Sequence, residues 1–246
     1  MKDKNFLDAL NDWGSILTDT YEVNSKFEPE YKVKVDNIQH IHITSVVAHR
    51  YANTKIVKQL IFKTGLHTIE SSAFADSSFV GPLNLPDGLE YIDPYAFNGC
   101  TDLIGGLNIP DSVKCINFKS FASCTGFTSL KLPASLINIG PRSFENCTGL
   151  TGTIEIPGSV SLIGSSTFAN CTNIESLIIN DGVCVIKSGA FEGCSGLSGS
   201  LTIPRSVDII EQDVFNGCNF TEINISRRTK PHKNWNRGCD AEIKYY

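Results

Sequence analysis

Residues 156–171 read IPGSVSLIGSSTFANC, and variants of this phrase recur along the 246-residue chain. The phenylalanine of the phrase returns seven times, at intervals that alternate between 23 and 24 residues, as Phe74, Phe97, Phe121, Phe144, Phe168, Phe191 and Phe215. From Phe97 onward a cysteine follows three residues later, as Cys100, Cys124, Cys147, Cys171, Cys194 and Cys218. A fixed period of this length predicts a solenoid, in which each repeat is one coil stacked on the last.

One coil can be interpreted from the segment that follows Cys124. Leu130–Leu132 alternates apolar and polar residues, which predicts a short strand with one buried face. Leu136–Ile139 predicts a second short extended piece that ends in a glycine turn. The chain then turns back, and we expect a short helical or 3₁₀ turn from which Phe144 and Cys147 both point inward, because they are three residues apart.

The repeat alternates in length at one place only. The distance from strand to phenylalanine is always 14 residues, whereas the distance from cysteine to the next strand is six or seven. The longer coils carry the extra residue beside a glycine, at Gly105-Gly106, Gly152-Thr153 and Gly199-Ser200. Glycine tolerates the backbone angles of a bulge, so we predict a β-bulge in every second coil and a repeating unit of 47 residues.

The composition excludes several classes of protein. With 41% hydrophobic and 19% charged residues, the chain is unlike a disordered one. A net charge of -5 argues against nucleic-acid binding, and we interpret the locally basic stretch 227–237 as a solvated end. No run of 18 apolar residues occurs, so we expect no membrane span. The N-terminal residues 1–6 lack the apolar core of a signal peptide.

The cysteines predict buried thiols, although nine in one chain could suggest a disulfide-rich secreted protein. Six of them occupy one position of the repeat, so they stack in a column about 5 Å apart, the spacing of adjacent strands. Disulfides along such a column would need a special geometry at each step, and free buried thiols are the simpler prediction. No C-x-x-C or C-x-x-H pair occurs, which argues against structural zinc.

The repeated pattern Ile-Pro-x-Ser-Val-x-x-Ile-(Gly)-x-x-x-Phe-x-x-Cys-x-x-Leu resembles the BspA-type leucine-rich repeat. The departures are small: Asn180 and Lys63 stand where proline is usual, and Ser77 stands where the first cysteine would be. The resemblance implies a right-handed, β-rich superhelix with a parallel sheet on one face and short turns or 3₁₀ segments on the other. It also implies the absence of catalytic residues, and a role like that of surface adhesins and interaction proteins of bacteria and protozoa.

Three segments are predicted along the chain. Residues 1–45 form an N-terminal cap, with a helix over 6–20 followed by an extended segment. Residues 46–226 form the solenoid of about eight coils, the first of which is worn and contains Val46 and Tyr51. Residues 227–246 form a C-terminal cap, because a solenoid needs its exposed ends covered.

Catalytic motifs are missing from the sequence. His40 and His42 would share one face of a strand and could bind a metal, but no third ligand of comparable quality is visible, so we interpret them as solvated or cap-packing residues. No G-x-S-x-G, H-E-x-x-H or phosphate-binding loop occurs. We therefore expect a protein that is not an enzyme and uses neither a metal nor a cofactor.

The first candidate binding surface is the outward face of the Leu-x-Leu strands. Its middle residues form a column of Asn84, Asn108, Lys131, Glu155, Ile178 and Thr202, with Lys131 and Glu155 as an opposed pair of charges. Concave solenoid faces are the usual binding surfaces of repeat proteins, so we predict a groove for an extended partner. The alternative is an ordinary solvated sheet face.

The second candidate is an apolar column in the second extended piece, formed by Tyr91, Cys115, Leu162, Val185 and Ile209. If this column is exposed, it is a stripe of the kind that marks interfaces. The alternative is that it packs under the preceding turn.

Two functions therefore stay open at this point. The family resemblance favours a non-catalytic cell-surface or secreted adhesin that recognises a protein, such as a host matrix or cell-surface protein, or else a glycan. The absence of a leader favours a structural or scaffold subunit of a cytoplasmic or virion-associated assembly, docking through the apolar column or the N-terminal segment. Neither alternative involves nucleic acid.

Overall fold

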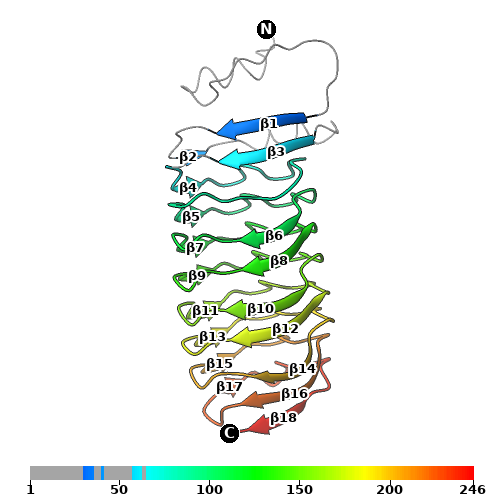
Figure 1. Ribbon diagram of the computed structural model, residues 1–246. Helices are drawn as coiled ribbons and strands as arrows, with labels where there is room; N and C mark the ends of the chain where they lie inside the picture. The colour runs from blue at the N-terminus through cyan, green and yellow to red at the C-terminus, as the bar shows by residue number, and fades with distance from the viewer. Residues whose placement is uncertain (1–29, 36–39, 42–56, 63–64) are drawn as a thin grey trace, which may run out of the picture.

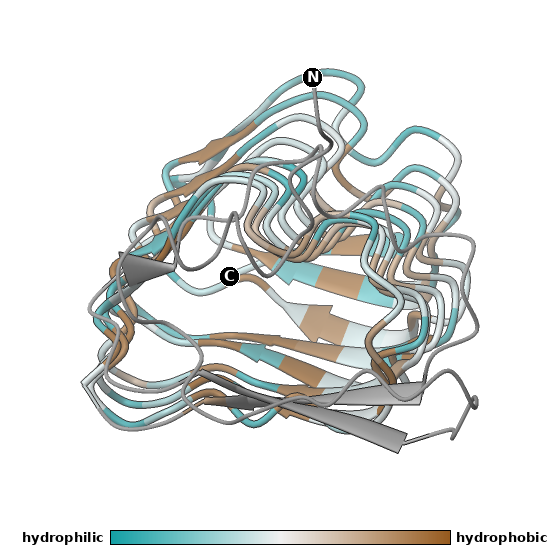
Figure 2. Cartoon of the chain, turned by 90° about the horizontal axis from the view of Figure 1, so that it is seen from above, coloured by the Kyte–Doolittle hydropathy of each residue, from teal (hydrophilic) through white to brown (hydrophobic). Residues whose placement is uncertain are grey.

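The structure, a computed structural model, describes residues 30–35, 40–41, 57–62 and 65–246. The chain forms a right-handed parallel β-solenoid of about eight turns, whose coils follow one another along a single stack (Figure 1). The helix predicted over residues 6–20 and the worn coil predicted at Val46 and Tyr51 lie outside the described residues. Viewed along the stack, the coils overlie one another around a shared interior (Figure 2).

The longer strands stack in parallel along one side of the solenoid, whose outward side we call the long-strand face. They are β1 (Glu30–Val35), β3 (Val57–Phe62), β6 (Gly105–Asn108), β8 (Phe127–Lys131), β10 (Gly152–Ile156), β12 (Ile174–Ile179), β14 (Ser198–Thr202), β16 (Asn219–Ile225) and β18 (Glu242–Tyr245). In β10, β12 and β16, buried residues alternate with exposed or half-buried ones, so that one set faces the core and the other faces outward.

Strands of two residues stack along a second side, whose outward side we call the short-strand face. They are β2 (His40–Ile41), β4 (Thr68–Ile69), β5 (Tyr91–Ile92), β7 (Cys115–Ile116), β9 (Asn138–Ile139), β11 (Leu162–Ile163), β13 (Val185–Ile186), β15 (Ile209–Ile210) and β17 (Lys230–Pro231). They form one unbroken sheet in the order β17-β15-β13-β11-β9-β7-β5-β4-β2. The sequence predicted the extended pieces but not their union in a second sheet.

The third side consists of turns rather than of 3₁₀ helices. In the coil around Phe144, Arg142 and Asn146 are left-handed, with φ of 57° and 60°. Such a backbone cannot continue a helix, and its amides bond to the next coil instead. The amide of Phe144 donates to the carbonyl of Thr167 at 2.9 Å, and the amide of Asn146 donates to the carbonyl of Ala169 at 2.8 Å.

The predicted bulges are confirmed. The strand register shifts between Gly105 and Gly106, between Gly152 and Thr153, and between Gly199 and Ser200. The long strands form separate sheets, which are β1–β3, β6–β8, β10–β12 and β14–β16–β18. Each of the last three sheets begins with a bulged strand. Among the described residues, no backbone ladder joins β8 to β10 or β12 to β14.

The seven phenylalanines form a continuous column of rings in the core. Neighbouring centroids are 5.1–5.8 Å apart and the ring planes are inclined by 3–15°. At the two ends Phe62 and Trp235 meet the terminal rings edge-on, at 5.8 Å and 6.0 Å. The six cysteines of the repeat lie beside this column, buried and free.

Both stacks of strands extend beyond residues 46–226. β1 pairs with β3, and β2 with β4, before the predicted start of the solenoid. At the other end β17 pairs with β15, and β18 with β16. The segments at both ends thus share the sheets of the stack, and the division into cap, solenoid and cap stays a prediction.

Candidate binding surfaces

All six residues of the first predicted column lie exposed on the long-strand face. Strand pairing aligns two pairs of them, with Asn108 beside Lys131 on β6 and β8, and Glu155 beside Ile178 on β10 and β12. Ile178 is 47% exposed, which is unusual for a large apolar side chain. The column therefore offers one cation, one anion and one apolar contact within neighbouring coils.

Lys131 and Glu155 do not form an ion pair, although they stand in neighbouring coils. Among the described residues, no ion pair includes either side chain. Glu155 instead accepts a hydrogen bond from the Asn180 amide, whose Nδ2 lies 2.9 Å from Oε1. Lys131 and Glu155 also belong to different sheets, β6–β8 and β10–β12, so the strands do not hold them side by side.

A second column on the long-strand face was not recognised from the sequence. It lies two residues before the first column and consists of small residues, most of them hydroxyl-bearing: Gly106, Ser129, Thr153, Ser176 and Ser200. The hydroxyls of Thr153 and Ser176 lie 2.6 Å apart and share a hydrogen bond. Period-two alternation could have located this column, because residues two apart in a strand share a face.

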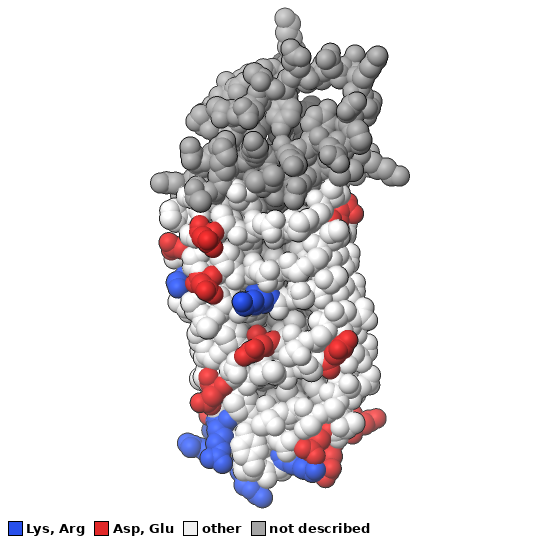
Figure 3. Space-filling model, in the orientation of Figure 1, with Lys and Arg blue, Asp and Glu red and all other residues white. Residues whose placement is uncertain are grey.

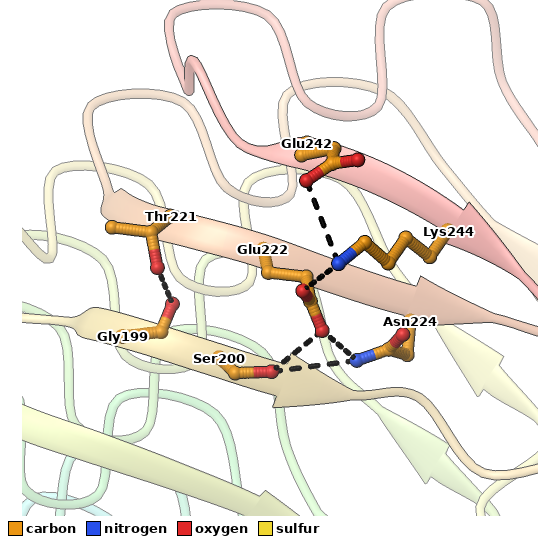
Figure 4. A network of polar contacts seen from close by, with 7 residues as sticks. All are labelled: Gly199, Ser200, Thr221, Glu222, Asn224, Glu242 and Lys244. Atoms are coloured by element: carbon orange, nitrogen blue, oxygen red, sulfur yellow. Dashed lines mark hydrogen bonds and ion pairs between the residues drawn. The ribbon is translucent and has the colours of Figure 1, made fainter.

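The long-strand face carries few charges over most of its length (Figure 3). Most of its outward side chains are neutral hydrogen-bonding groups, namely Asn, Ser and Thr. At its C-terminal end the pattern changes, and Lys244 of β18 contacts both Glu222 and Glu242 (Figure 4). Hydrogen bonding from Lys244 lowers the pKa of the Glu222 carboxyl. Asn224 also donates to Glu222 at 2.7 Å, so this acid is fully occupied within the protein.

The apolar column lies on the outward side of the unbroken short-strand sheet. Tyr91 and Ile209 are 42% and 44% exposed, while Cys115, Leu162 and Val185 are half-buried. Each is the first residue of a two-residue strand whose second residue, an isoleucine, is fully buried. The column therefore does not pack under the preceding turn, because strand alternation turns it outward.

A metal site is absent from the described residues. Within them, no three His, Cys, Asp or Glu side chains are placed to hold a metal ion. The side chains of His40 and His42 lie outside the description. The part of the chain that the structure describes also contains no helix with the length and apolar character of a membrane span.

The burial of the thiols makes them poor nucleophiles. Burial raises the pKa of Cys100, Cys147 and Cys194 to about 12. A thiol with such a pKa is protonated at neutral pH, whereas the thiolate is the reactive form. The cysteine column is therefore a structural feature of the core.

Comparison with known proteins identifies the family. The sequence profile described as "BspA type Leucine rich repeat region" matches in six copies, over residues 29–120 and 104–221. The chain belongs to the BspA-type leucine-rich repeat family. No curated protein sequence gives a significant match. The BspA-type profile starts at residue 29, next to β1, and so agrees with the N-terminal extent of the sheets.

Solved structures with the same architecture are remote in sequence. A leucine rich cell surface protein from Faecalibacterium prausnitzii A2-165 is 20% identical with a TM-score of 0.52, over 88% of this chain and 59% of that chain. The pneumococcal vaccine antigen PcpA is 20% identical with a TM-score of 0.44, over 76% and 62%. A leucine rich repeat protein from T. pallidum is 23% identical with a TM-score of 0.46, over 72% and 77%. These likenesses concern the fold alone.

Proposed function

We propose that this BspA-type chain is a non-catalytic, adhesin-like binding protein that recognises a protein ligand through the long-strand face. The observation that carries the proposal is the pair of columns on the outward side of this face, which strand pairing holds in register within each sheet. They present neutral hydrogen-bonding groups over several coils, together with exposed Ile178 and unpaired Lys131. An extended partner could follow such columns from coil to coil.

Two comparisons favour a binding role over catalysis. Repeat proteins of this kind use extended surfaces for recognition. One structural relative is described as a leucine rich cell surface protein, and the present chain spans 59% of the length of that relative. A host matrix or cell-surface protein is the proposed partner, and a glycan is the alternative on the same face.

The test measures binding of the purified chain to immobilised host matrix proteins and to host-cell membranes. The face variant is Asn108→Arg/Lys131→Glu, and the matched control is Gln212→Arg/Lys233→Glu, which changes exposed side chains outside the long-strand face. Loss of binding in the face variant and retention in the control would support the proposal. Protease or glycosidase treatment of the target then distinguishes a protein ligand from a glycan.

A scaffold role within a larger assembly is the second candidate, because the apolar column is partly exposed. It predicts that binding survives the face variant and is lost when Leu162 is replaced by lysine. Binding that neither change affects would contradict both proposals.

A further inference from the structure

A column of surface residues runs along the corner where each coil turns from its long strand into its short strand. Its members are Asp87, Asp111, Ala134, Gly158, Asp181, Arg205 and Arg227. The corner is the same in each coil, because the amide of Val207 donates to the carbonyl of Pro204 at 3.1 Å and the amide of Thr229 donates to Ser226 at 3.1 Å. Arg227 thus occupies in the last coil the position that Arg205 occupies one coil earlier.

The charges of this corner column are segregated by sign. Along the stack the three acids come first, and they are Asp87, Asp111 and Asp181. The two bases come last, and they are Arg205 and Arg227. All five side chains are exposed. In the described part of the chain, none of the five takes part in an ion pair; Arg205 stacks over the ring of Tyr246. Lysines and arginines gather at the C-terminal end of the stack in Figure 3.

The same segregation holds for all the charged residues between positions 65 and 246. Residues 65–226 contain 6 Lys and Arg and 16 Asp and Glu, a net charge of -10. Residues 227–246 contain 6 Lys and Arg and 2 Asp and Glu, a net charge of +4. The stack is therefore acidic over residues 65–226 and basic over residues 227–246, so one copy carries two regions of opposite charge.

Four of the five corner charges are spaced symmetrically about the coil that contains Gly158, whereas Asp181 has the uncharged Ala134 at the equivalent position. Asp87 and Arg227 lie three coils from it in opposite directions, and Asp111 and Arg205 lie two coils from it. When a second copy packs antiparallel to the first, each charge faces the residue at the same distance on the other side of the centre. Charges of opposite sign at equal distances therefore lie opposite one another. A parallel pair would instead place Asp87 on Asp87 and Arg227 on Arg227, which like-charge repulsion disfavours.

The outward residues of the short strands, which include the apolar column, follow the same symmetry beside the corner, and the polar Asn138 of β9 would face Val185 of β13 one coil from the centre. Leu162 lies in the central coil and would face its own counterpart, and Cys115 would face Ile209 two coils away. Tyr91 would face Lys230 three coils away, which suits a cation–π contact. An apolar centre with charged ends is the usual anatomy of a protein interface.

We propose that the short-strand face is a homodimer interface, in which two copies pack antiparallel about a two-fold axis that runs along β11. The corner column of one copy then faces that of the other, with Asp87 against Arg227 and Asp111 against Arg205. The contact extends over seven coils, a length of about 30 Å at the spacing of adjacent strands. It is isologous, as two-fold interfaces are, and it leaves the long-strand face of each copy free.

A polyanion is a poorer occupant of this surface than a second copy. It would match Arg205 and Arg227, but it would be repelled by Asp87, Asp111 and Asp181 on the same column. A second copy matches both halves at once. The dimer goes beyond ligand recognition by one chain, because it would present two binding faces and strengthen attachment to a multivalent surface.

The test is sedimentation equilibrium of the full chain at low and high salt. The wild type should dimerise at micromolar concentration, and salt should weaken the dimer because exposed charges are screened. Asp87→Lys/Asp111→Lys and Arg205→Glu/Arg227→Glu should each raise the dissociation constant by at least about tenfold, since each places like charges opposite one another. An equimolar mixture of the two variants should form a heterodimer of near wild-type affinity, because their charges match again.

Two further variants locate the contact. Leu162→Lys should abolish the dimer by placing two cations on the axis, whereas Ile178→Lys on the long-strand face should leave it intact. Circular dichroism melts check that each variant is folded. A wild type that is monomeric throughout, a dimer indifferent to both charge reversals, or a mixture that fails to associate would overturn the proposal. A monomer that binds heparin through Arg205 and Arg227 would identify a polyanion as the occupant instead.

Discussion

The thiol of Cys147 donates a hydrogen bond to the backbone carbonyl of Phe121, one coil earlier, with Sγ 3.0 Å from the oxygen. The same bond recurs at 2.9–3.2 Å for Cys100, Cys124, Cys171, Cys194 and Cys218. The Phe121 carbonyl also accepts the amide of Cys124 within its own turn, at 3.2 Å. Each thiol therefore fills space in the core and ties two coils together.

Replacement of Cys147 by alanine should lower the free energy of unfolding by about 1–3 kcal/mol, because it removes this bond and leaves a small cavity. Cys147→Ser should cost less than the alanine variant if its hydroxyl keeps the bond to Phe121. Cys184→Ala is the matched control, since Cys184 is half-buried outside the column. Urea denaturation measures all three, and a Cys147→Ala protein as stable as wild type would show that the thiol bond contributes nothing.

Alkaline pH should destabilise the fold through the same thiols. Burial raises the pKa of Cys147 to about 12, whereas an unfolded cysteine titrates near about 8.5. Between these values the native thiol keeps its proton and the unfolded one has lost it, so stability is fully present below about pH 8 and falls as pH rises. Each such thiol contributes a slope of about 1.4 kcal/mol per pH unit.

Chemical denaturation between pH 8 and pH 11 measures this slope. Lysine and tyrosine also titrate in the range, so the comparison is between wild type and Cys147→Ala under identical conditions. The variant should lose stability less steeply, by the contribution of one thiol. Equal slopes would mean that the buried thiol does not keep its proton.

The aromatic column predicts the largest single loss of stability. Phe144 is fully buried and stacks between Phe121 and Phe168 at 5.5 Å and 5.2 Å. Phe144→Ala should cost about 3–5 kcal/mol, as the loss of a buried aromatic ring does. Thermal or urea unfolding measures the effect, with Tyr91→Ala as the control because Tyr91 is 42% exposed. A similar cost for the two variants would contradict a dominant contribution from the column.

The fold could be predicted from the sequence because every coil places the same residue types at the same positions. The period located Phe144 and its counterparts, and the extra residue beside Gly152 located the bulge. It did not predict the left-handed residues at Arg142 and Asn146, because neither residue type requires that conformation. Bonds to the neighbouring coil hold these angles, and such bonds depend on the stack as a whole.

The candidate surfaces were less accessible to prediction from sequence. Alternation alone placed Lys131 and Ile178 on an outward face, but it could not decide whether Leu162 was covered. Leu162 faces outward because the short strands pair into a sheet of their own. This pairing joins residues of different coils, so alternation within one strand does not reveal it. The corner charges were missed for a different reason: Asp87 and Arg227 lie 140 residues apart, and their symmetry appears only when the coils are aligned in space.

Gly152 at the bulge and Gly158 at the corner lie in the same coil, and their replacement by alanine should destabilise the fold for different reasons. A Cβ atom on Gly158 would lie 1.9 Å from the carbonyl oxygen of Asp181, so the corners of two coils would have to separate. Gly152 has room for a Cβ atom, but its φ of +68° is left-handed. We expect Gly158→Ala to cost about 3 kcal/mol through overpacking, and Gly152→Ala to cost about 1 kcal/mol through backbone strain.

Asparagine at the same two positions separates the mechanisms. Asparagine tolerates left-handed angles better than alanine does, so Gly152→Asn should be more stable than Gly152→Ala. Gly158→Asn should be at least as damaging as Gly158→Ala, because any Cβ atom meets the carbonyl of Asp181. Urea denaturation of the four variants gives the comparison. If asparagine rescued position 158 and not position 152, the close approach of the corners and the strain at the bulge would both be misassigned.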